Sequence, residues 1–553
     1  MHQRHASSRI LSLVVVILWG GVGSVVAQDA AHEHGGRPRR LGRVHFPTSC
    51  AASTQAAFDD GVALLHSFWF SAAIAAFEGV LARDPQCVMA HWGIAMSWWG
   101  NPFAASRSSQ ALEAGRAALA AASESSPAPP AGRSAPTDRE RAYLAAVGRL
   151  FDPAPMAPHA RLVSYAQAMA ALSDAFPDDV EARVFHALAL AQSAPPTDKT
   201  YANQLKAGAI LEAEFARQPE HPGLAHYIIH SFDVPALAPR ALAAARRYAS
   251  IAPDAPHALH MPSHTFTRVG AWQESIDTNR ASAAAARKDG ATAEELHALD
   301  YQAYAYLQLA QDAAARQTVD AVPALVLKID TRGAGNAAPP AAGFYAAAAI
   351  PARYALERDA WTEAAALPIT KSPTPWADAV THFARAIGAA RSGQAAAARE
   401  DLARLDAIAH TLHASGDAYW SEQVAIQQLA ARAWVLLADG AADQAVLALR
   451  EAADREDATE KAAVTPGPLS PAREQLGDML LGLQRPVDAL AAYEATLVKE
   501  PGRYRARHGA ARAAMAAGRR AEARTHYAAL VALAGSATSR PELVDARRLG
   551  TTP

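Results

Sequence analysis

Histidines recur at helical spacing between residues 221 and 301, in the runs HPGLAHYIIHSFD, APHALHMPSHTF and ELHALDYQAY. A helix turns about 100° per residue, so His226 and His230 lie one turn apart on one face, and His257, His260 and His264 share a narrow arc of the next helix. Neutral imidazoles are common ligands of transition metals. The cluster predicts metal binding, or catalysis or ligand recognition without a metal, and tight structural packing is the alternative that stays open.

The candidate ligands of a divalent transition metal are His226, His230, His257, His260 and His264. Three aspartates nearby are candidates for ligands or for acceptors that fix an imidazole tautomer, namely Asp233, Asp254 and Asp300. The helix of His226 and His230 lacks the glutamate of an HExxH metalloprotease motif. The sequence shows no phosphate loop and no nucleophile elbow, so it assigns no catalytic residue.

The composition and the first residues of the chain indicate a folded, exported protein. The 553 residues are 51% hydrophobic and carry a formal net charge of −2, which argues against a disordered chain and against a nucleic-acid partner. Residues 1–27 combine Arg4 and Arg9 with an apolar run and end in Val25-Val26-Ala27, which predicts a secretory signal peptide, with an uncleaved anchor as the alternative. We expect the mature chain to begin at Gln28, to be periplasmic or secreted, and to contain no integral membrane segment.

The chain has two cysteines, Cys50 and Cys87, one before the first expected helix pair and one just after its end. In an oxidising compartment this arrangement predicts a disulfide bond. Two separate buried thiols are the alternative.

Apolar residues repeat with a period near 3.6 throughout, which predicts an all-α protein. Residues Arg485–Leu497 align with Arg519–Val531 at an offset of 34 residues, so that Tyr493 matches Tyr527. The positions of small residues and aromatics resemble those of the tetratricopeptide repeat (TPR). The resemblance implies a right-handed α-solenoid of degenerate TPR helix pairs.

We predict the order signal peptide 1–27, flexible His-containing linker 28–47, N-terminal TPR-like helices 48–122, Pro/Ser-rich linker 123–137, His-rich TPR-like region 138–332, Gly/Pro-rich loop 333–342, C-terminal TPR repeats 343–536 and tail 537–553. A further irregular stretch, Asp457–Pro471, is either a solvated connection or a segment that folds over the concave surface.

The sequence as a whole resembles a family of exported bacterial TPR proteins that share the phrases LLHSFWF (Leu64–Phe70), AHWGIAMS (Ala90–Ser97), APHALHMPSHTFTR (Ala255–Arg268) and EDATEKAAVTPGPL (Glu456–Leu469). The resemblance spans nearly the whole mature chain. It implies the fold and the export, and it assigns no catalytic residue because the family has no settled biochemical activity.

The first helix of each TPR pair lines the concave groove, and the histidines fall on first helices. The leading hypothesis is therefore an exported solenoid that binds a protein or peptide partner in its groove; loops of the chain that filled the groove would contradict it. The predicted groove residues are His186, Tyr227, His297, Asp300, Tyr301 and Tyr304. The alternative hypothesis is a metal-binding protein or metal-dependent hydrolase centred on the histidine cluster.

Overall fold

The structure is a computed structural model that describes residues 39–104, 107–124, 135–154, 156–195, 197–331 and 337–550. Residues Arg40–Pro553 form one compact unit, separate from Met1–Arg39. The predicted signal peptide, most of the predicted linker 28–47 and the middle of the linker 123–137 lie outside the described residues. Among the helices of the described ranges, none has the length and apolar character needed to cross a membrane.

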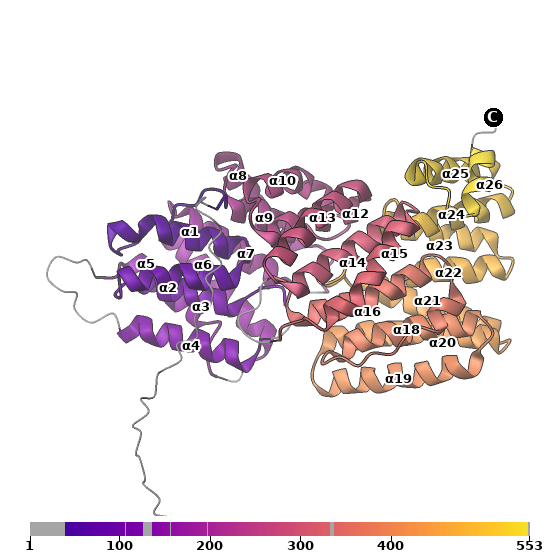
Figure 1. Cartoon of the computed structure of the whole chain (residues 1–553), viewed down its shortest axis with the longest axis horizontal. Helices are drawn as coiled ribbons and strands as arrows, with labels where there is room; N and C mark the ends of the chain where they lie inside the picture. The colour runs from indigo at the N-terminus through magenta and orange to yellow at the C-terminus, as the bar shows by residue number, and fades with distance from the viewer. Residues whose placement is uncertain are drawn as a thin grey trace, which may run out of the picture. The chain divides into compact units, whose positions relative to one another are not determined.

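All regular elements of the described ranges are helices (Figure 1). The N-terminal elements are η1 (Ala52–Thr54), α1 (Gln55–His66), α2 (Phe70–Arg83), α3 (Val88–Trp99), α4 (Ser109–Glu124), α5 (Asp138–Gly148), α6 (Pro158–Ala175), α7 (Val180–Gln192) and α8 (Ala202–Arg217). The central helices are α9 (Pro222–Ser231), α10 (Ala238–Ile251), α11 (Pro256–His260), α12 (Pro262–Val269), α13 (Trp272–Lys288), α14 (Thr292–Gln308), α15 (Asp312–Val326), α16 (Pro340–Leu356) and α17 (Trp361–Ala365).

The C-terminal helices are α18 (Pro375–Arg391), α19 (Ala395–Ala414), α20 (Ala418–Ala438), α21 (Ala442–Ala458), α22 (Ala472–Gly482), α23 (Pro486–Lys499), α24 (Tyr504–Ala516), α25 (Arg520–Ala534) and α26 (Glu542–Gly550). Neighbouring helices pack in pairs, and the first helix of a pair also contacts the first helix of the next, as α14 contacts α16 and α18 contacts α20. The predicted class, a solenoid of degenerate TPR helix pairs, is confirmed.

Aromatic side chains on second helices fill the space that glycines leave on neighbouring first helices. A Cβ atom added at Gly93 would lie 2.4 Å from the ring of Phe77, and one added at Gly509 would lie 2.3 Å from the ring of Tyr493. Both rings are buried, at 0% and 1% exposure. The repeat positions recognised in the sequence are therefore sites of close helix approach.

Part of the predicted flexible linker packs on the array. Phe46 is fully buried, and its ring centroid lies 5.6 Å from that of Phe58 and 5.2 Å from that of Trp92. Its backbone N–H donates to Asp59 Oδ1 over 2.9 Å. The linker prediction was wrong for this stretch because one large aromatic side chain finds an apolar pocket among the first helices.

Two further predicted boundaries differ from the structure. The predicted tail 537–553 contains helix α26, which packs on α25 and buries Leu543 and Ala546. Helix α16 begins at Pro340, inside the predicted loop 333–342, because a proline is well suited to the first turn of a helix.

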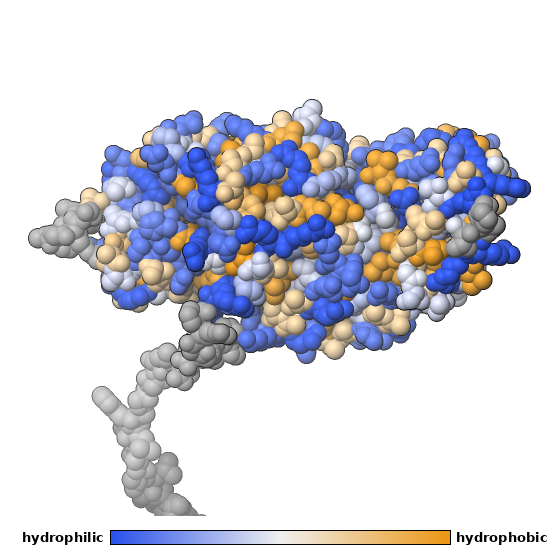
Figure 2. All heavy atoms as spheres, turned by 90° about the horizontal axis from the view of Figure 1, so that it is seen from above, coloured by the Kyte–Doolittle hydropathy of each residue, from blue (hydrophilic) through white to orange (hydrophobic). Residues whose placement is uncertain are grey.

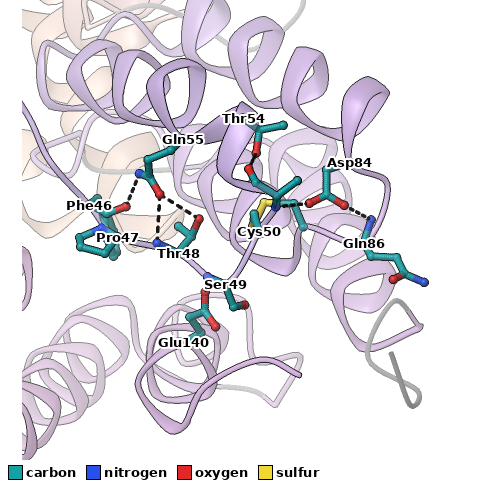
Figure 3. The surroundings of a disulfide bond; sticks show 12 residues. Phe46, Pro47, Thr48, Ser49, Cys50, Thr54, Gln55, Asp84, Gln86 and Glu140 are labelled. Carbon is teal, nitrogen blue, oxygen red and sulfur yellow. Dashed lines mark hydrogen bonds between the residues drawn. A yellow bond between two sulfur atoms is a disulfide. The ribbon is translucent and has the colours of Figure 1, made fainter. Parts of the chain in front are cut away.

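The predicted disulfide is present and joins Cys50 to Cys87, which are 37 residues apart (Figure 3). Backbone hydrogen bonds hold the surrounding chain: Ala51 N donates to Asp84 Oδ2 over 2.7 Å, and Ser49 N donates to Glu140 Oε1 over 2.7 Å. The disulfide and these hydrogen bonds fix the chain before α1 against the start of α3 and against α5.

The double substitution Cys50→Ala and Cys87→Ala is expected to lower the free energy of unfolding by about 2–4 kcal/mol, because the open chain gains conformational entropy in the unfolded state. Chemical denaturation of parent and variant without reductant measures the difference. Adding reductant should bring the parent to the stability of the variant, and equal stabilities without reductant would contradict this role.

Candidate metal centre

Three successive first helices bring the histidines together. Helix α9 lies against α12, and α11 lies against α14. Their inward faces carry His226 and His230 from α9, His257 and His260 from α11, His264 from α12 and His297 from α14. The rings form two groups of three, which we name the first triad (His226, His230, His257) and the second triad (His260, His264, His297).

The break between α11 and α12 does not separate their histidines. Pro262 has no backbone N–H and interrupts the helical hydrogen bonds. Met261 nevertheless keeps right-handed helical angles, with φ −53° and ψ −35°, so the chain continues in the same direction. His260 and His264 consequently remain one turn apart, with ring centroids 5.1 Å apart.

The first triad presents ring nitrogens that lack a protein partner. The ligating atoms of the three rings lie within 4.8 Å of one another. His226 Nδ1–H donates to the carbonyl oxygen of His66 over 2.6 Å, which leaves the lone pair of Nε2 free. Among the described residues, none pairs with His226 Nε2, His230 Nε2 or either ring nitrogen of His257. Buried polar atoms are normally hydrogen-bonded, so these nitrogens are candidate ligands of a metal ion.

The second triad has its tautomers fixed by hydrogen bonds. Asn279 Nδ2 donates to the carbonyl oxygen of Ser275 over 2.7 Å, so its Oδ1 faces His260 as an acceptor. His260 Nδ1–H therefore donates to Asn279 Oδ1 over 2.6 Å. His264 Nδ1–H donates to the carboxylate of Asp233 over 2.8 Å. Such outer hydrogen bonds are typical of histidines that bind a metal through the other nitrogen.

As a result, two lone pairs face each other. His260 Nε2 and His264 Nε2 are 3.1 Å apart, and neither neutral ring has a proton left to place between them. The hydroxyl of Tyr301 lies 3.3 Å from His264 Nε2, and its shorter contact is to the carbonyl oxygen of Thr465. Two nitrogen ligands of a tetrahedral ion with bonds of 2.0–2.1 Å lie about 3.3 Å apart. His297 faces them with a ring centroid 4.4 Å from that of His260, and its Nδ1 has no partner among the described residues. The ligating nitrogens of the three rings lie within 4.8 Å of one another, so this group could hold a metal ion.

Burial lowers the pKa of each of these imidazoles, because a charged ring loses its hydration. The pKa of His226 and that of His297 fall to about 3. For His257 and His260, neighbouring histidines lower the pKa further by repelling a second positive charge. The rings are therefore neutral at pH 7, which is the form that binds a metal.

A third group, His66 with Glu181 and His221, has a different character. His66 Nε2 and His221 Nε2 lie 2.9 and 2.8 Å from the two oxygens of Glu181. The remaining nitrogen of His66 lies 2.9 Å from the hydroxyl of Tyr227, and that of His221 accepts the backbone N–H of Leu224. Every ring nitrogen has a protein partner, so this group is a structural network rather than a metal site.

The residues predicted to line a binding groove are buried. Their exposed fractions are 7% for His186, 1% for Tyr227, 5% for His297, and 0% for Asp300, Tyr301 and Tyr304. Of these residues, His297 belongs to the second triad. His297 was predicted as a groove residue and not as a metal ligand, although it shares the inward register of the other histidines.

The chain's own segment 459–469 covers Tyr301 and binds Arg353, the partner of Asp300. Tyr301 OH donates to the carbonyl oxygen of Thr465 over 3.1 Å. Arg353 donates to the carbonyl oxygens of Gly467 and Pro468 over 2.8 and 3.0 Å. Of the two alternatives for this stretch, folding over the concave surface is what the structure shows, and the expectation of an open groove fails at these residues.

Asp233 connects the segment 459–469 to the second triad. Its carboxylate accepts hydrogen bonds from His264, from Arg268 Nε over 3.0 Å and from Lys461 Nζ over 3.0 Å. Burial alone would raise the pKa of Asp233, but Lys461 and Arg268 hold it well below its usual range. Of the three aspartates considered in the sequence, Asp233 alone touches a histidine of the triads, since Asp254 binds Arg40 and Asp300 binds Arg353.

Comparison with known proteins adds little about function. No family model and no curated protein matches the chain. Similar solved structures include a human IFIT1 dimer with m7Gppp-AAAA (11% identity, 81% of this chain and 90% of that chain, TM-score 0.36) and the APC/C hetero-tetramer Cut9-Hcn1 (12%, 90% and 90%, TM-score 0.32). The TPR domain of P58(IPK) is also similar (16%, 66% and 98%, TM-score 0.20). These scores carry no argument about activity, and the fold assignment rests on the helix packing itself.

Acid is expected to destabilise the metal-free protein before its carboxylates titrate. The pKa of His226 and of His297 is about 3 in the folded chain and about 6.5 when unfolded, so the unfolded state binds more protons between these values. This stabilisation is complete above pH 6.5 and is lost as the pH falls toward 3. Each of the two rings should contribute a slope of about 1.4 kcal/mol per pH unit between pH 6 and 5.

Urea denaturation of chelator-treated protein at several pH values measures the slope. The double variant His226→Gln, His297→Gln should have a slope shallower by roughly 2–3 kcal/mol per pH unit. The variant His410→Gln, at a side chain that is 80% exposed, is the control and should match the parent. Identical slopes in parent and double variant would contradict the burial of neutral imidazoles.

Proposed function

We propose that this protein binds two transition-metal ions, one in each triad. The observation that carries the proposal is the pair of facing lone pairs on His260 Nε2 and His264 Nε2, 3.1 Å apart, with both Nδ1 atoms already committed as donors. The unpartnered ring nitrogens of the first triad support a second ion beside it. The triads adjoin, since the ring centroids of His257 and His260 are 5.9 Å apart.

The donor set favours particular metals. Both triads offer imidazole nitrogen alone, which suits zinc, copper, iron and nickel better than magnesium or calcium, whose preferred ligands are oxygens. A histidine-only set is neutral, so a bound divalent ion would keep its full charge. Arg268 and Lys461 lie near the second triad and bring further positive charge to its side.

Three protein ligands per ion are typical of catalytic metal sites, whereas structural sites usually have four. A divalent ion held this way leaves a position for water or substrate and lowers the pKa of a bound water, which is the chemistry of metal-dependent hydrolysis. The residues of this chain would hold the imidazoles in their tautomers through Asn279, Asp233 and the carbonyl of His66. We therefore propose, more specifically, that the bound metal ions serve hydrolysis.

Only the class of fold supports the hypothesis that the protein binds a protein partner. Helical repeats commonly present concave surfaces to proteins or ligands. The predicted groove residues are buried, and the segment 459–469 covers Tyr301 among them, so a partner would use another surface of the array. Figure 2 shows one face on which hydrophobic residues gather in small groups among hydrophilic ones, which is unlike the broad apolar patch of an obligate interface.

We also propose that the chain is exported to the periplasm or secreted. The predicted signal peptide at residues 1–27 supports export. The disulfide between Cys50 and Cys87 is compatible with it, because disulfides persist in oxidising compartments.

Untagged protein dialysed against Cu(II), Zn(II) or Co(II) and then desalted is expected to retain about two equivalents of metal per chain. The variant His226→Ala should retain about one equivalent, held by the second triad, and His264→Ala should retain about one, held by the first. Elemental analysis by mass spectrometry gives the ratios. Retention of one ion shows that each variant is folded.

His410→Ala is the matched control for these variants and should bind as much metal as the parent, because His410 is exposed and remote from both triads in the sequence. A parent protein that retains no metal would contradict the proposal. The existence of two separate sites would be contradicted if the parent protein bound a single ion and if His226→Ala and His264→Ala each abolished its binding.

Expression of the full chain in a Gram-negative host should yield a mature protein that begins at Gln28, because Ala27 ends the small-residue cleavage motif. Intact-mass analysis of the periplasmic fraction identifies the first residue. A cell-associated chain that retains Met1 would contradict export by this signal.

A further inference from the structure

A cavity of about 660 Å³ adjoins the two triads. Its wall includes His230 and His257 of the first triad and His264 and His297 of the second. It also includes Thr411 and Ser415, which are exposed and therefore place one end of the cavity at the surface. A molecule that enters there would meet the histidines at the buried end. The volume is within the range of pockets that enclose small organic ligands.

Aromatic rings form the sides of this cavity. Trp376 and Trp420 are stacked with centroids 3.9 Å apart and planes inclined by 1°, and both line the space. Phe103 stacks on His230 with centroids 4.2 Å apart and an inclination of 18°. Flat apolar walls of this kind bind flat apolar molecules, since ring pairs in stacked or edge-to-face contact add to the effect of burying their area.

The residues that line the cavity carry little charge of their own. Asp417 is the one residue with a charged side chain among those that line the cavity, and its Oδ1 already accepts the N–H of Trp420 at the start of α20. The described lining offers no lysine or arginine to pair with a phosphate or sulfate. The polar groups concentrated at the buried end are instead the neutral imidazoles, of which His257 and His297 are each 5% exposed and carry unpartnered nitrogens.

We propose that this cavity binds a small uncharged aromatic molecule with a hydroxyl group, such as a phenol or naphthol, with the ring between Trp420 and Phe103 and the hydroxyl toward the triads. The predicted position of the hydroxyl group rests on the proposed metal function, because a bound metal ion would take the hydroxyl oxygen as a ligand. The predicted position of the aromatic ring rests on the shape and lining of the cavity alone. The proposed ligand class is thus an aromatic alcohol.

The test uses 2-naphthol as the probe, with 2-methoxynaphthalene, whose hydroxyl is capped, and glucose as comparisons. Calorimetry on Co(II)-loaded and metal-free protein measures binding, and the visible absorption bands of Co(II) report a new ligand at the metal. We expect 2-naphthol to bind the loaded protein more tightly than the metal-free protein and to shift the bands. We expect 2-methoxynaphthalene to bind both forms alike without a shift, and glucose not to bind.

Two variants test the place of binding. Trp420→Ala should weaken 2-naphthol binding by roughly 3- to 10-fold through loss of ring contact. Because that change can disturb the stack with Trp376, Ser415→Trp, at the exposed end, provides a second test and should block entry. His413→Trp, exposed on the same turn but not part of the cavity wall, is the matched control and should bind like the parent.

The outcomes separate the two proposals. A protein that fails to load Co(II) contradicts the metal centre, and calorimetry on the metal-free form still decides whether the cavity binds the ring. A protein that loads Co(II) but gives neither heat nor a band shift with 2-naphthol overturns the cavity proposal and leaves the metal centre standing. Binding that Ser415→Trp and His413→Trp leave equally unchanged also overturns it.

Discussion

The hydrogen bonds at the Nδ1 atoms of His226, His260 and His264 are the constraint on which the rest of the site depends. Each bond commits one nitrogen as a donor, to the carbonyl of His66, to Asn279 or to Asp233, and so turns the Nε2 lone pair inward. The rings cannot escape this arrangement by protonation, because burial keeps the pKa of each low. Buried acceptors with too few donors are costly, and a metal ion bound as we propose would remove that cost.

The helical array and the segment 459–469 supply the burial. Successive first helices align the histidine faces, and the segment closes the concave side through Tyr301 and Arg353. Lys461 of this segment also reaches Asp233, which orients His264. A stretch that looks like a surface connection is therefore part of the wall around the candidate metal centre.

Much of the fold follows from the sequence because helical repeats depend on local spacing. The predicted helix pairs and the predicted disulfide between the two cysteines each have a direct structural counterpart. The five histidines of α9, α11 and α12 do lie together, since they sit on the same face of adjacent helices.

The rest depends on contacts between residues far apart in sequence. The burial of Tyr301 and Tyr304 was not predictable because the segment that covers them is more than 150 residues away, as the bond from Tyr301 to Thr465 spans 164 residues. The cavity likewise joins Phe103 to Trp420, which no local pattern connects. The division into two triads, and the place of His297 in one of them, needed the positions of three helices at once.

X-ray absorption spectroscopy of the metal-loaded protein tests the central claim most directly, because it reports the atoms bound to the ion. The account predicts a first shell of nitrogen at about 2.0 Å with the outer-shell scattering of roughly three imidazole rings per ion. A first shell of oxygen alone, or scattering from no more than one imidazole per ion, would contradict it.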